Sequence, residues 1–196
     1  MKKLVIASNN QGKLREIQSL LTPLNIEVLP QSHFNIAEAA EPHCTFIENA
    51  LAKARHASLH TNLPALADDS GLCVTALQGA PGVHSAYYGG EPRSDANNNA
   101  HLLEMLKSEN NRAAYYYCAL VLVRAHDDPQ PIIAEGIWPG EILTEPRGDG
   151  GFGYDPLFLD KSGKTGAELD AATKNKISHR GQALQQLILK LQALQI

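Results

Sequence analysis

The stretch that decides the fold reads Leu4-Val5-Ile6-Ala7-Ser8-Asn9-Asn10-Gln11-Gly12-Lys13. Its first four residues are apolar, as in a buried strand, and the polar residues after them end that strand. Leu14, Ile17 and Leu21 then recur at helical spacing, so a helix begins at the end of this stretch. A strand that leads through a short loop into a helix is typical of α/β folds.

Further apolar runs and helical patterns follow along the chain. Pro23 is expected to end the first helix, and Thr45 with Glu48 forms a T-x-x-E capping box that predicts the start of the second. Strands and helices mix without strict alternation, which predicts an α/β fold with a mixed, twisted sheet and flanking helices. The predicted elements are strands over 4–7, 26–29, 65–68 and 72–77, a long hairpin pairing 115–124 with 131–138 around a turn at 127–129, helices over 12–22, 45–59, 95–107 and 178–194, and glycine-rich loops over 79–93 and 148–153.

Length and composition fit an ordinary globular protein. The 196 residues suit one domain over 1–196, with room for two lobes, and the 43% hydrophobic content supports a core without disulfides. Cys44, Cys73 and Cys118 form no C-x-x-C pair, so we expect three free thiols in a reducing compartment.

Charge and hydropathy exclude several classes of protein. The apolar run near the N-terminus is shorter than the ~7–15 residues of a signal peptide, and no window approaches the ~18 apolar residues of a membrane span. We therefore expect a cytoplasmic protein without membrane contact. The net charge of −4 argues against a polynucleotide-coating surface, although a local cluster of cations can still hold one nucleotide.

Ser8 to Lys13 has the features of a phosphate-binding turn. It precedes a helix N-terminus, where free backbone N–H groups and the helix dipole favour an anion. Lys13 adds a positive charge, and Gly12 allows close approach of the backbone. The segment is not a P-loop, because Ala7 and Leu14 stand where G-x-x-x-x-G-K-[ST] requires Gly and Ser or Thr. Taken alone, it can equally be a polar turn with a surface lysine.

Four carboxylates lie near the ends of predicted elements: Glu41, Glu48, Asp68 and Asp69. Mg²⁺ binds through one or two carboxylates together with phosphate oxygens and water. Asp68 and Asp69 are adjacent on extended chain, so their side chains point to opposite faces and only one can face a given site. Glu48 already has a structural use in the capping box, and Asp69 can simply form the turn that follows it.

The segment from Gly148 to Pro156 combines four glycines with two aromatic rings. The glycines let the backbone approach a ligand, and Phe152 and Tyr154 offer faces on which a base can stack, worth about 1–3 kcal/mol per base. Asp155 adds an acceptor beside them. The alternative is a flexible hairpin loop.

Lys174, Lys176, His179 and Arg180 gather just before or within the first turn of the last predicted helix. Cations there oppose the helix macrodipole, at a cost of about 0.3 kcal/mol or more each. An anionic or acceptor-rich ligand would explain this inversion, and solvated charges are the alternative.

His56 and His60 lie four residues apart on the second helix, a spacing that can bind zinc. No glutamate stands between them as in H-E-x-x-H, so we expect two exposed histidines. Lys53, on the same helix, is unremarkable by itself.

Taken together, these segments resemble the inosine/xanthosine triphosphate pyrophosphatase family. They occur in the family's order and span nearly the whole chain, so modest motifs become highly specific in combination. The matching stretches are Ser8-Asn9-Asn10-Gln11-Gly12-Lys13, Phe46-Ile47-Glu48-Asn49-Ala50 with Lys53, Ala67-Asp68-Asp69-Ser70-Gly71-Leu72, Gly79-Ala80-Pro81-Gly82-Val83, Gly150 to Pro156, and Ile177-Ser178-His179-Arg180-Gly181-Gln182-Ala183-Leu184.

The resemblance implies a pyrophosphohydrolase that cleanses the nucleotide pool of non-standard purine nucleotides. It would hydrolyse dITP, ITP or XTP to the nucleoside monophosphate and pyrophosphate, with Mg²⁺ as cofactor. It also implies a homodimer, and an active site in a central cleft between two lobes of a mixed α/β fold.

The resemblance also implies roles for individual residues. Asp69 looks like the general base and a metal ligand, Glu41 is similar to the second metal ligand, and Lys13 and Lys53 resemble catalytic lysines that neutralise phosphate. The residues that look like substrate contacts are Ser8, Asn9, Asn10, Gln11, Gly12 and Lys13 in the phosphate loop, Ser70, and, in the base pocket, Phe152, Gly153, Tyr154, Asp155, Lys174, His179 and Arg180.

In the mechanism that this implies, Asp69 deprotonates a water that attacks in line at a phosphorus next to the αβ bridge. Selectivity would follow from donors on His179 or Arg180, which pair with the 6-oxygen of hypoxanthine or xanthine and face a donor in adenine. Guanine shares that oxygen, so its rejection requires another contact.

Two departures from the family pattern concern the site. Tyr87 stands where the family usually has arginine, and Ala172-Thr173 replace the acids usual before Lys174. Two other functions compete with the resemblance: a pyrophosphatase for modified pyrimidine triphosphates, and a non-catalytic nucleotide- or RNA-binding module. The Ser178-His179-Arg180-Gly181 segment and the loop at 150–155 argue against the former.

Overall fold

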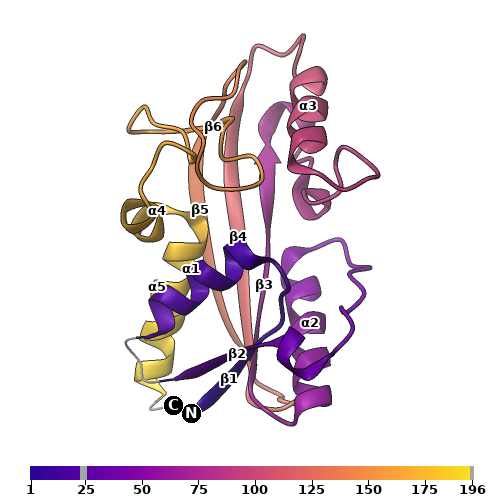
Figure 1. Ribbon diagram of the computed structural model, residues 1–196, viewed down its shortest axis with the longest axis vertical. Coiled ribbons are helices and arrows are strands. Elements are labelled where there is room, and N and C mark those ends of the chain that lie inside the picture. Colours follow the sequence, from indigo (N-terminus) through magenta and orange to yellow (C-terminus); the bar gives the residue numbers. More distant parts are fainter. Residues whose placement is uncertain (23–25, 195–196) are drawn as a thin grey trace. The chain divides into compact units, whose positions relative to one another are not determined.

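The computed structural model describes residues 1–22 and 26–194 (Figure 1). Within them, six strands form one sheet in the order β2-β1-β3-β4-β5-β6. Strand β1 pairs in parallel with β2 and with β3, whereas β5 and β6 pair antiparallel, so the sheet is mixed as predicted. The strands are β1 (Lys3–Ile6), β2 (Glu27–Pro30), β3 (Ala65–Val74), β4 (Ala113–Val123), β5 (Ile132–Ile142) and β6 (Phe158–Asp160). The predicted helix stop at Pro23 lies outside the described residues.

The helices begin where the sequence places good N-caps. Asn10 caps α1 by accepting from the Lys13 N–H, and Thr45 caps α2 by accepting from the Glu48 N–H. The Thr45 hydroxyl also donates to the Glu48 carboxylate, so the predicted capping box is present. The helices are α1 (Gln11–Leu21), α2 (Phe46–Thr61), α3 (Asp95–Met105), α4 (Ala171–Ile177) and α5 (His179–Ala193), with short 3₁₀ helices η2 (Gln31–Phe34), η3 (Thr75–Leu77) and η4 (Gly82–His84).

The chain divides into two compact units, and the division falls within β3, β4 and β5. Unit 1 comprises Met1–Asp69, Cys118–Gly136 and Arg180–Ile196, and unit 2 comprises Ser70–Tyr117 and Ile137–His179. Each unit has a hydrophobic core of its own.

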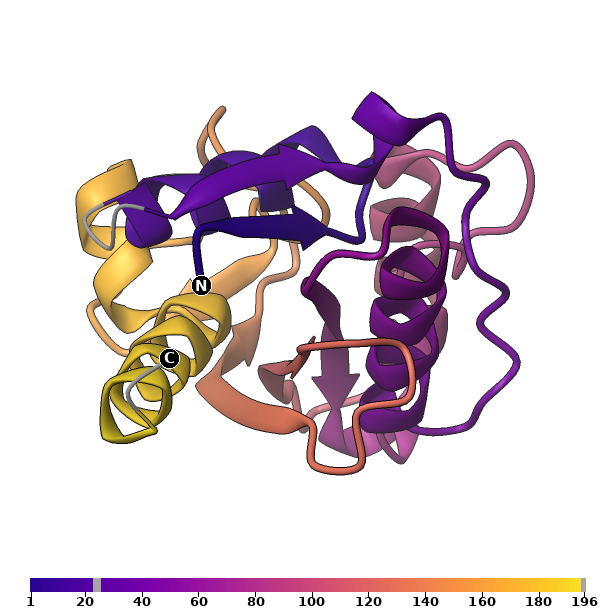
Figure 2. The same ribbon diagram turned by 90° about the horizontal axis from the view of Figure 1, so that it is seen from below.

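The core of unit 1 lies between helices and strands. Ile17 and Leu21 of α1 and Leu184 and Leu187 of α5 are fully buried against residues of β1, β3, β4 and β5, among them Leu120. Helix α2 lies on the other side of these strands from α5 (Figures 1 and 2). Its buried face consists of small residues, which bring the helix close to the sheet.

The core of unit 2 is aromatic. Tyr116, Trp138 and Phe158 pack together with ring centroids 4.7–6.0 Å apart. Tyr154, Leu102 and Leu157 are among the other buried members of the cluster. Aromatic rings packed at these distances add stabilisation beyond that from the apolar area they bury.

Two predicted strands differ from the structure, and two elements of the structure were not predicted. The strands predicted over 65–68 and 72–77 are one strand, β3, because the chain stays extended through Asp68 and Asp69, and 75–77 turns into η3. The predicted helix over 178–194 is preceded by a separate helix, α4, and β6 was not predicted. Strands β4 and β5 are neighbours joined through a turn near Asp128, which confirms the hairpin.

The cysteines are all free thiols: Cys44 is exposed, whereas Cys73 and Cys118 are buried. Among the described helices, none is long and apolar enough to cross a membrane.

Candidate active site

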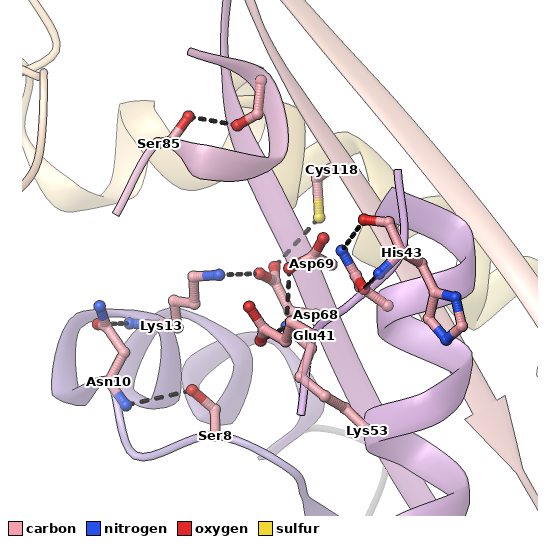
Figure 3. Close-up of polar contacts among 12 residues, drawn as sticks. Ser8, Asn10, Lys13, Glu41, His43, Lys53, Asp68, Asp69, Ser85 and Cys118 are labelled. Atoms are coloured by element: carbon pink, nitrogen blue, oxygen red, sulfur yellow. Dashed lines mark hydrogen bonds and ion pairs between the residues drawn. The ribbon is translucent and has the colours of Figure 1, made fainter. Parts of the chain in front are cut away.

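Asp68 and Asp69 have different partners because β3 remains a strand at this point. Successive side chains of a strand point to opposite faces. Asp68 bonds to Lys13 and Arg180, whereas Asp69 bonds to Lys53. The predicted separation of the two carboxylates is confirmed (Figure 3).

Asp68 is the centre of a buried ion-pair network in unit 1. Lys13 Nζ lies 2.5 Å from Oδ1, and Arg180 Nε lies 2.8 Å from Oδ2. The buried thiol of Cys118 lies 3.1 Å from Oδ2. Burial opposes ionisation of Asp68, but the charges of Arg180 and Lys13 outweigh it and hold the pKa of this carboxyl well below its usual value.

Glu16 is the other acidic partner in this network. Arg180 Nη1 lies 2.5 Å from Glu16 Oε2, and the guanidinium is almost completely buried. Arg180 therefore belongs to unit 1 with its donors directed at two carboxylates, whereas the other residues of the predicted base pocket belong to unit 2. Its assignment as a reader of the base stays a prediction. Sequence reasoning missed Glu16, although its i, i+3 spacing from Lys13 puts both on one face of α1.

Asp69 forms a second, smaller network with Lys53 and Glu41. Lys53 Nζ lies 2.7 Å from Asp69 Oδ1 and 2.7 Å from Glu41 Oε1. Burial raises the pKa of Asp69 despite the attraction of Lys53. Burial acts against the charge of Lys53 as well, but the two carboxylates outweigh it and raise the pKa of the ammonium. A carboxylate with a raised pKa is a stronger base than an ordinary aspartate.

The residues around Asp69 fit a hard divalent cation. Asp69 Oδ2 is buried and has no hydrogen-bond partner among the described residues, and Glu41 is brought close by Lys53. Nowhere in residues 1–22 and 26–194 does a group of three or more His, Cys, Asp or Glu side chains offer a complete metal site. Two carboxylates that are completed by phosphate oxygens and water are what Mg²⁺ needs.

The predicted phosphate loop, Ser8 to Lys13, lies at the N-terminus of α1. Asn10 Oδ1 accepts from the Lys13 N–H at 3.0 Å, and the Ser8 hydroxyl accepts from the Asn10 N–H at 3.2 Å. The N–H groups of Gln11 and Gly12 precede the first intrahelical hydrogen bond, from Leu14 to Asn10. Such groups are available to an anion.

Unit 2 brings together most of the predicted base-binding residues. Lys174 is buried, with Nζ 2.6 Å from Asp155 Oδ2 and 4.8 Å from the centroid of the Phe152 ring. Asp155 Oδ2 also accepts from the Phe152 N–H at 2.8 Å. Gly151 has φ +73° and faces the Asp155 carboxylate so closely that a Cβ would overlap it. The loop is therefore ordered around Asp155 and is not the flexible hairpin of the alternative interpretation.

Two predicted base contacts, Tyr154 and His179, are buried in this structure. The Tyr154 ring is buried and its hydroxyl donates to the Ser85 carbonyl at 2.8 Å, so it is not open for stacking, contrary to the prediction. His179 is buried as well and stacks on Tyr116, with centroids 4.6 Å apart. Ser70, another predicted contact, is half-buried in β3.

Helix α3 holds the 152–154 backbone, a contribution that sequence reasoning missed. Gly153 donates its N–H to Asp95 at 2.7 Å and accepts at its carbonyl from Asn99 at 2.8 Å. Asp95 and Asn99 lie four residues apart on one face of α3, and this spacing was the signal in the sequence.

The predicted inversion of charge at the last helix is wrong for Lys174 and Lys176. Both lie in the last turn of α4, where cations complement the helix dipole. Asp170 caps this helix by accepting from the Thr173 N–H at 2.8 Å, and the Thr173 hydroxyl donates back to it. The residues that replace the expected acids thus stabilise the start of the helix.

Tyr87 stands where the resemblance leads one to expect arginine. Its exposed ring lies beside Arg93. The Arg93 guanidinium lies 4.8 Å from the centroid of the Tyr87 ring, and Nη1 donates to the tyrosine hydroxyl at 3.3 Å. The loop therefore keeps a guanidinium next to residue 87.

Comparison with known proteins places this arrangement in a family. The model of the Ham1 family matches residues 4–190. This chain belongs to the Ham1 family. Among Ham1-like relatives, the dITP/XTP pyrophosphatase of Nitrosomonas europaea is 63% identical over 192 residues, covering 97% of this chain and 95% of that protein. The dITP/XTP pyrophosphatase of Chromobacterium violaceum is 62% identical, covering 98% of each.

Solved Ham1 structures have the same fold. The HAM1 protein of Coxiella burnetii superimposes with a TM-score of 0.92 at 48% identity, covering 98% of this chain and 100% of that one. The Ham1 protein of Staphylococcus aureus gives a TM-score of 0.88 at 37% identity with the same coverage. The α/β fold with a mixed sheet and flanking helices is therefore the Ham1 fold.

Proposed function

We propose that this chain hydrolyses non-standard purine nucleoside triphosphates (dITP, ITP and XTP) to the nucleoside monophosphate and pyrophosphate. The observation that carries the proposal is Asp69, a buried carboxylate with a raised pKa. One of its oxygens has no hydrogen-bond partner among the described residues, and Lys53 and Glu41 lie beside it. Relatives about 60% identical over nearly the whole chain, which are named dITP/XTP pyrophosphatase, support this substrate class.

In the proposed mechanism, Asp69 accepts a proton from the attacking water as that water approaches phosphorus in line. A buried base of raised pKa takes up this proton more readily than a solvated aspartate. Lys53 and Lys13 offset the negative charge that develops on the leaving pyrophosphate, which the N–H groups of Gln11 and Gly12 also contact.

Mg²⁺ is part of the proposal, held by Asp69 and Glu41. When bound there it would polarise the phosphoryl oxygens of the substrate. Lys53 lies between the two carboxylates and offsets their mutual repulsion.

Base recognition is assigned to the residues of unit 2. Lys174 and His179 supply the donors for the 6-oxygen of hypoxanthine or xanthine, and Phe152 supplies a ring face. A donor that must pair with this oxygen is left facing the amino group of adenine, and such mismatches discriminate by as much as about 10⁴-fold. Arg180 remains the other proposed donor, and it also holds Asp68 and thereby Lys13.

The remaining parts of the proposal concern organisation. The family match over 4–190 supports treating the chain as one pyrophosphatase domain, 1–196. The three free thiols are consistent with the reducing cytoplasm, where the nucleotide pool is found. A homodimer rests on the family resemblance alone.

The experiment that tests the proposal is a pyrophosphate-release screen with ITP, dITP, XTP, ATP, GTP, UTP and TTP, each with Mg²⁺ and with EDTA. We expect release from the first three substrates only, and only with Mg²⁺. Faster hydrolysis of UTP or TTP would favour a pyrimidine-directed enzyme. Tight ITP binding without pyrophosphate release would instead favour a non-catalytic binding module.

A further inference from the structure

Residues 36–43 connect η2 to α2 and form neither helix nor strand. A backbone without ladder hydrogen bonds depends on side chains from elsewhere to fix its position. Glu41 lies in this segment, so the position of a proposed metal ligand is determined by whatever holds residues 36–43.

One face of α2 supplies most of these contacts. Asn49, Lys53 and His56 are spaced i, i+4 and i+7, which places them in one row along the helix. His56 Nε2 lies 2.9 Å from the Ala37 carbonyl, and Lys53 Nζ lies 2.7 Å from Glu41. The same row therefore contacts the segment on the N-terminal side of Glu41 and at Glu41 itself.

Asn49 makes the contact on the C-terminal side of Glu41. Its Oδ1 accepts from the His43 N–H at 3.1 Å, and its Nδ2 donates to the His43 carbonyl at 3.1 Å. The side chain is buried and satisfies both backbone groups of one residue, as a neighbouring strand would. An amide side chain offers a donor and an acceptor side by side in one plane.

The segment also contacts the phosphate loop. Asn9 Nδ2 donates to Glu38 Oε1 at 2.9 Å, although these side chains are more exposed. Residues 36–43 are therefore fixed by α2 at three points and by the Ser8–Lys13 turn at a fourth.

We infer that Asn49 and His56 are positioning residues for Glu41, which hold residues 36–43 so that this carboxylate stays beside Lys53 and Asp69. This inference rests on the proposed function, because it assigns a purpose to the placement of Glu41. Neither side chain contacts the carboxylate itself; each acts through the backbone on one side of it.

The first test is a double-mutant cycle on ITP hydrolysis with Asn49→Ala and Glu41→Gln. Loss of a group that orients a metal ligand typically costs about 10- to 100-fold in activity or metal affinity. We expect Asn49→Ala to lower kcat/KM by this factor and to raise the activating Mg²⁺ concentration, and we expect a much smaller further loss when Glu41→Gln is already present. Equal losses in both backgrounds would overturn the inference, since effects through separate routes add.

The second test measures position without activity. Hydrogen exchange of peptides covering residues 36–44 should be faster in Asn49→Ala and in His56→Ala than in the parent protein, with exchange elsewhere unchanged. Asn49→Asp keeps the acceptor for the His43 N–H but loses the donor, so we expect an intermediate rate. Unchanged exchange in all three variants would overturn the inference.

Thr61→Ala is the control on the same helix, because the Thr61 hydroxyl donates to the Ala57 carbonyl within α2. We expect it to leave both exchange of 36–44 and Mg²⁺ activation unchanged. If the parent protein releases no pyrophosphate from any triphosphate, the proposed function fails, and the exchange experiment still decides whether Asn49 and His56 hold the segment.

Discussion

Two neighbouring aspartates on β3 show how burial and charged partners give identical side chains different pKa values. Asp68 faces Arg180 and Lys13, which depress its pKa and keep it charged. Asp69 is buried with fewer partners, and its pKa is raised. The former has the environment of a structural anion and the latter that of a base.

Asp69→Asn and Asp68→Asn should therefore fail in different ways. For Asp69→Asn we expect kcat to fall about 10²- to 10⁴-fold while the free energy of unfolding changes little, because Lys53 keeps Glu41 as a partner. For Asp68→Asn we expect destabilisation of about 3–5 kcal/mol, because Arg180 loses a buried partner. Steady-state kinetics and urea unfolding at pH 7 measure the two effects. Wild-type kcat in Asp69→Asn would contradict the assignment of the base.

The pH dependence of unfolding provides the control for Asp68. Its native pKa lies below the unfolded value near 3.8, so its contribution to stability is complete above that pH and is lost as the pH falls through the native pKa. The stability difference between wild type and Asp68→Asn should accordingly shrink below pH 3.8. A difference that persists undiminished in acid would mean that charge is not its source.

At the scale of single residues, the sequence predicts only those features that depend on local geometry. The alternation of a strand was sufficient to predict that Asp68 and Asp69 diverge. It did not predict which of them meets Arg180, because that partner lies 112 residues away along the chain. Contacts such as those of Asp95 and Asn99 with Gly153 depend in the same way on a packing arrangement that no local pattern encodes.

At the scale of elements, helix α4 shows how a short segment can position a buried lysine. Its last turn carries Lys174, and its start is fixed by Asp170 and Thr173. A helix of this length is too short to be stable by itself, so its N-cap and its contacts determine whether it forms.

Asp170→Ala should loosen α4 and thereby weaken substrate binding. Loss of an aspartate N-cap costs about 0.5–2 kcal/mol. We expect KM for ITP to rise several-fold while kcat stays close to the parent value, because Lys174 is proposed to contact the base rather than the reacting phosphorus. Asp170→Ser, which keeps a capping oxygen, should restore the parent KM. A fall in kcat with constant KM would contradict this division.

Helix α4 is also an element that the sequence pattern does not predict. A helix over 178–194 was correct in substance, because its leucines repeat with helical period. Helix α4 was missed because seven residues carry too little periodicity, and Ser178 interrupts the pattern between the two helices. The polar residues Asp68 and Asp69 likewise concealed the continuity of β3, because buried charged pairs do not look like a strand in sequence.

At the scale of the whole molecule, the chain has two cores but three strands that pass from one unit into the other. If one unit unfolded alone, each of these strands would lose the hydrogen bonds of one half, and the remaining half would fray. We therefore expect the two units to unfold in one cooperative transition.

The single tryptophan allows a test, since Trp138 lies in the core of unit 2. Leu120→Ala removes a fully buried side chain from the core of unit 1, which should cost about 2–5 kcal/mol. The urea midpoint should fall equally by Trp138 fluorescence and by far-ultraviolet circular dichroism. A fluorescence midpoint that stays at the parent value would show that the units unfold separately.

Cys44 is the exposed member of three free thiols and directly follows His43, whose backbone Asn49 holds. A maleimide dye would consequently attach to the native chain at one predictable position, with no need to introduce or remove a cysteine. The fluorescence of that dye would report on the surroundings of residue 44 in real time, as metal or nucleotide is added.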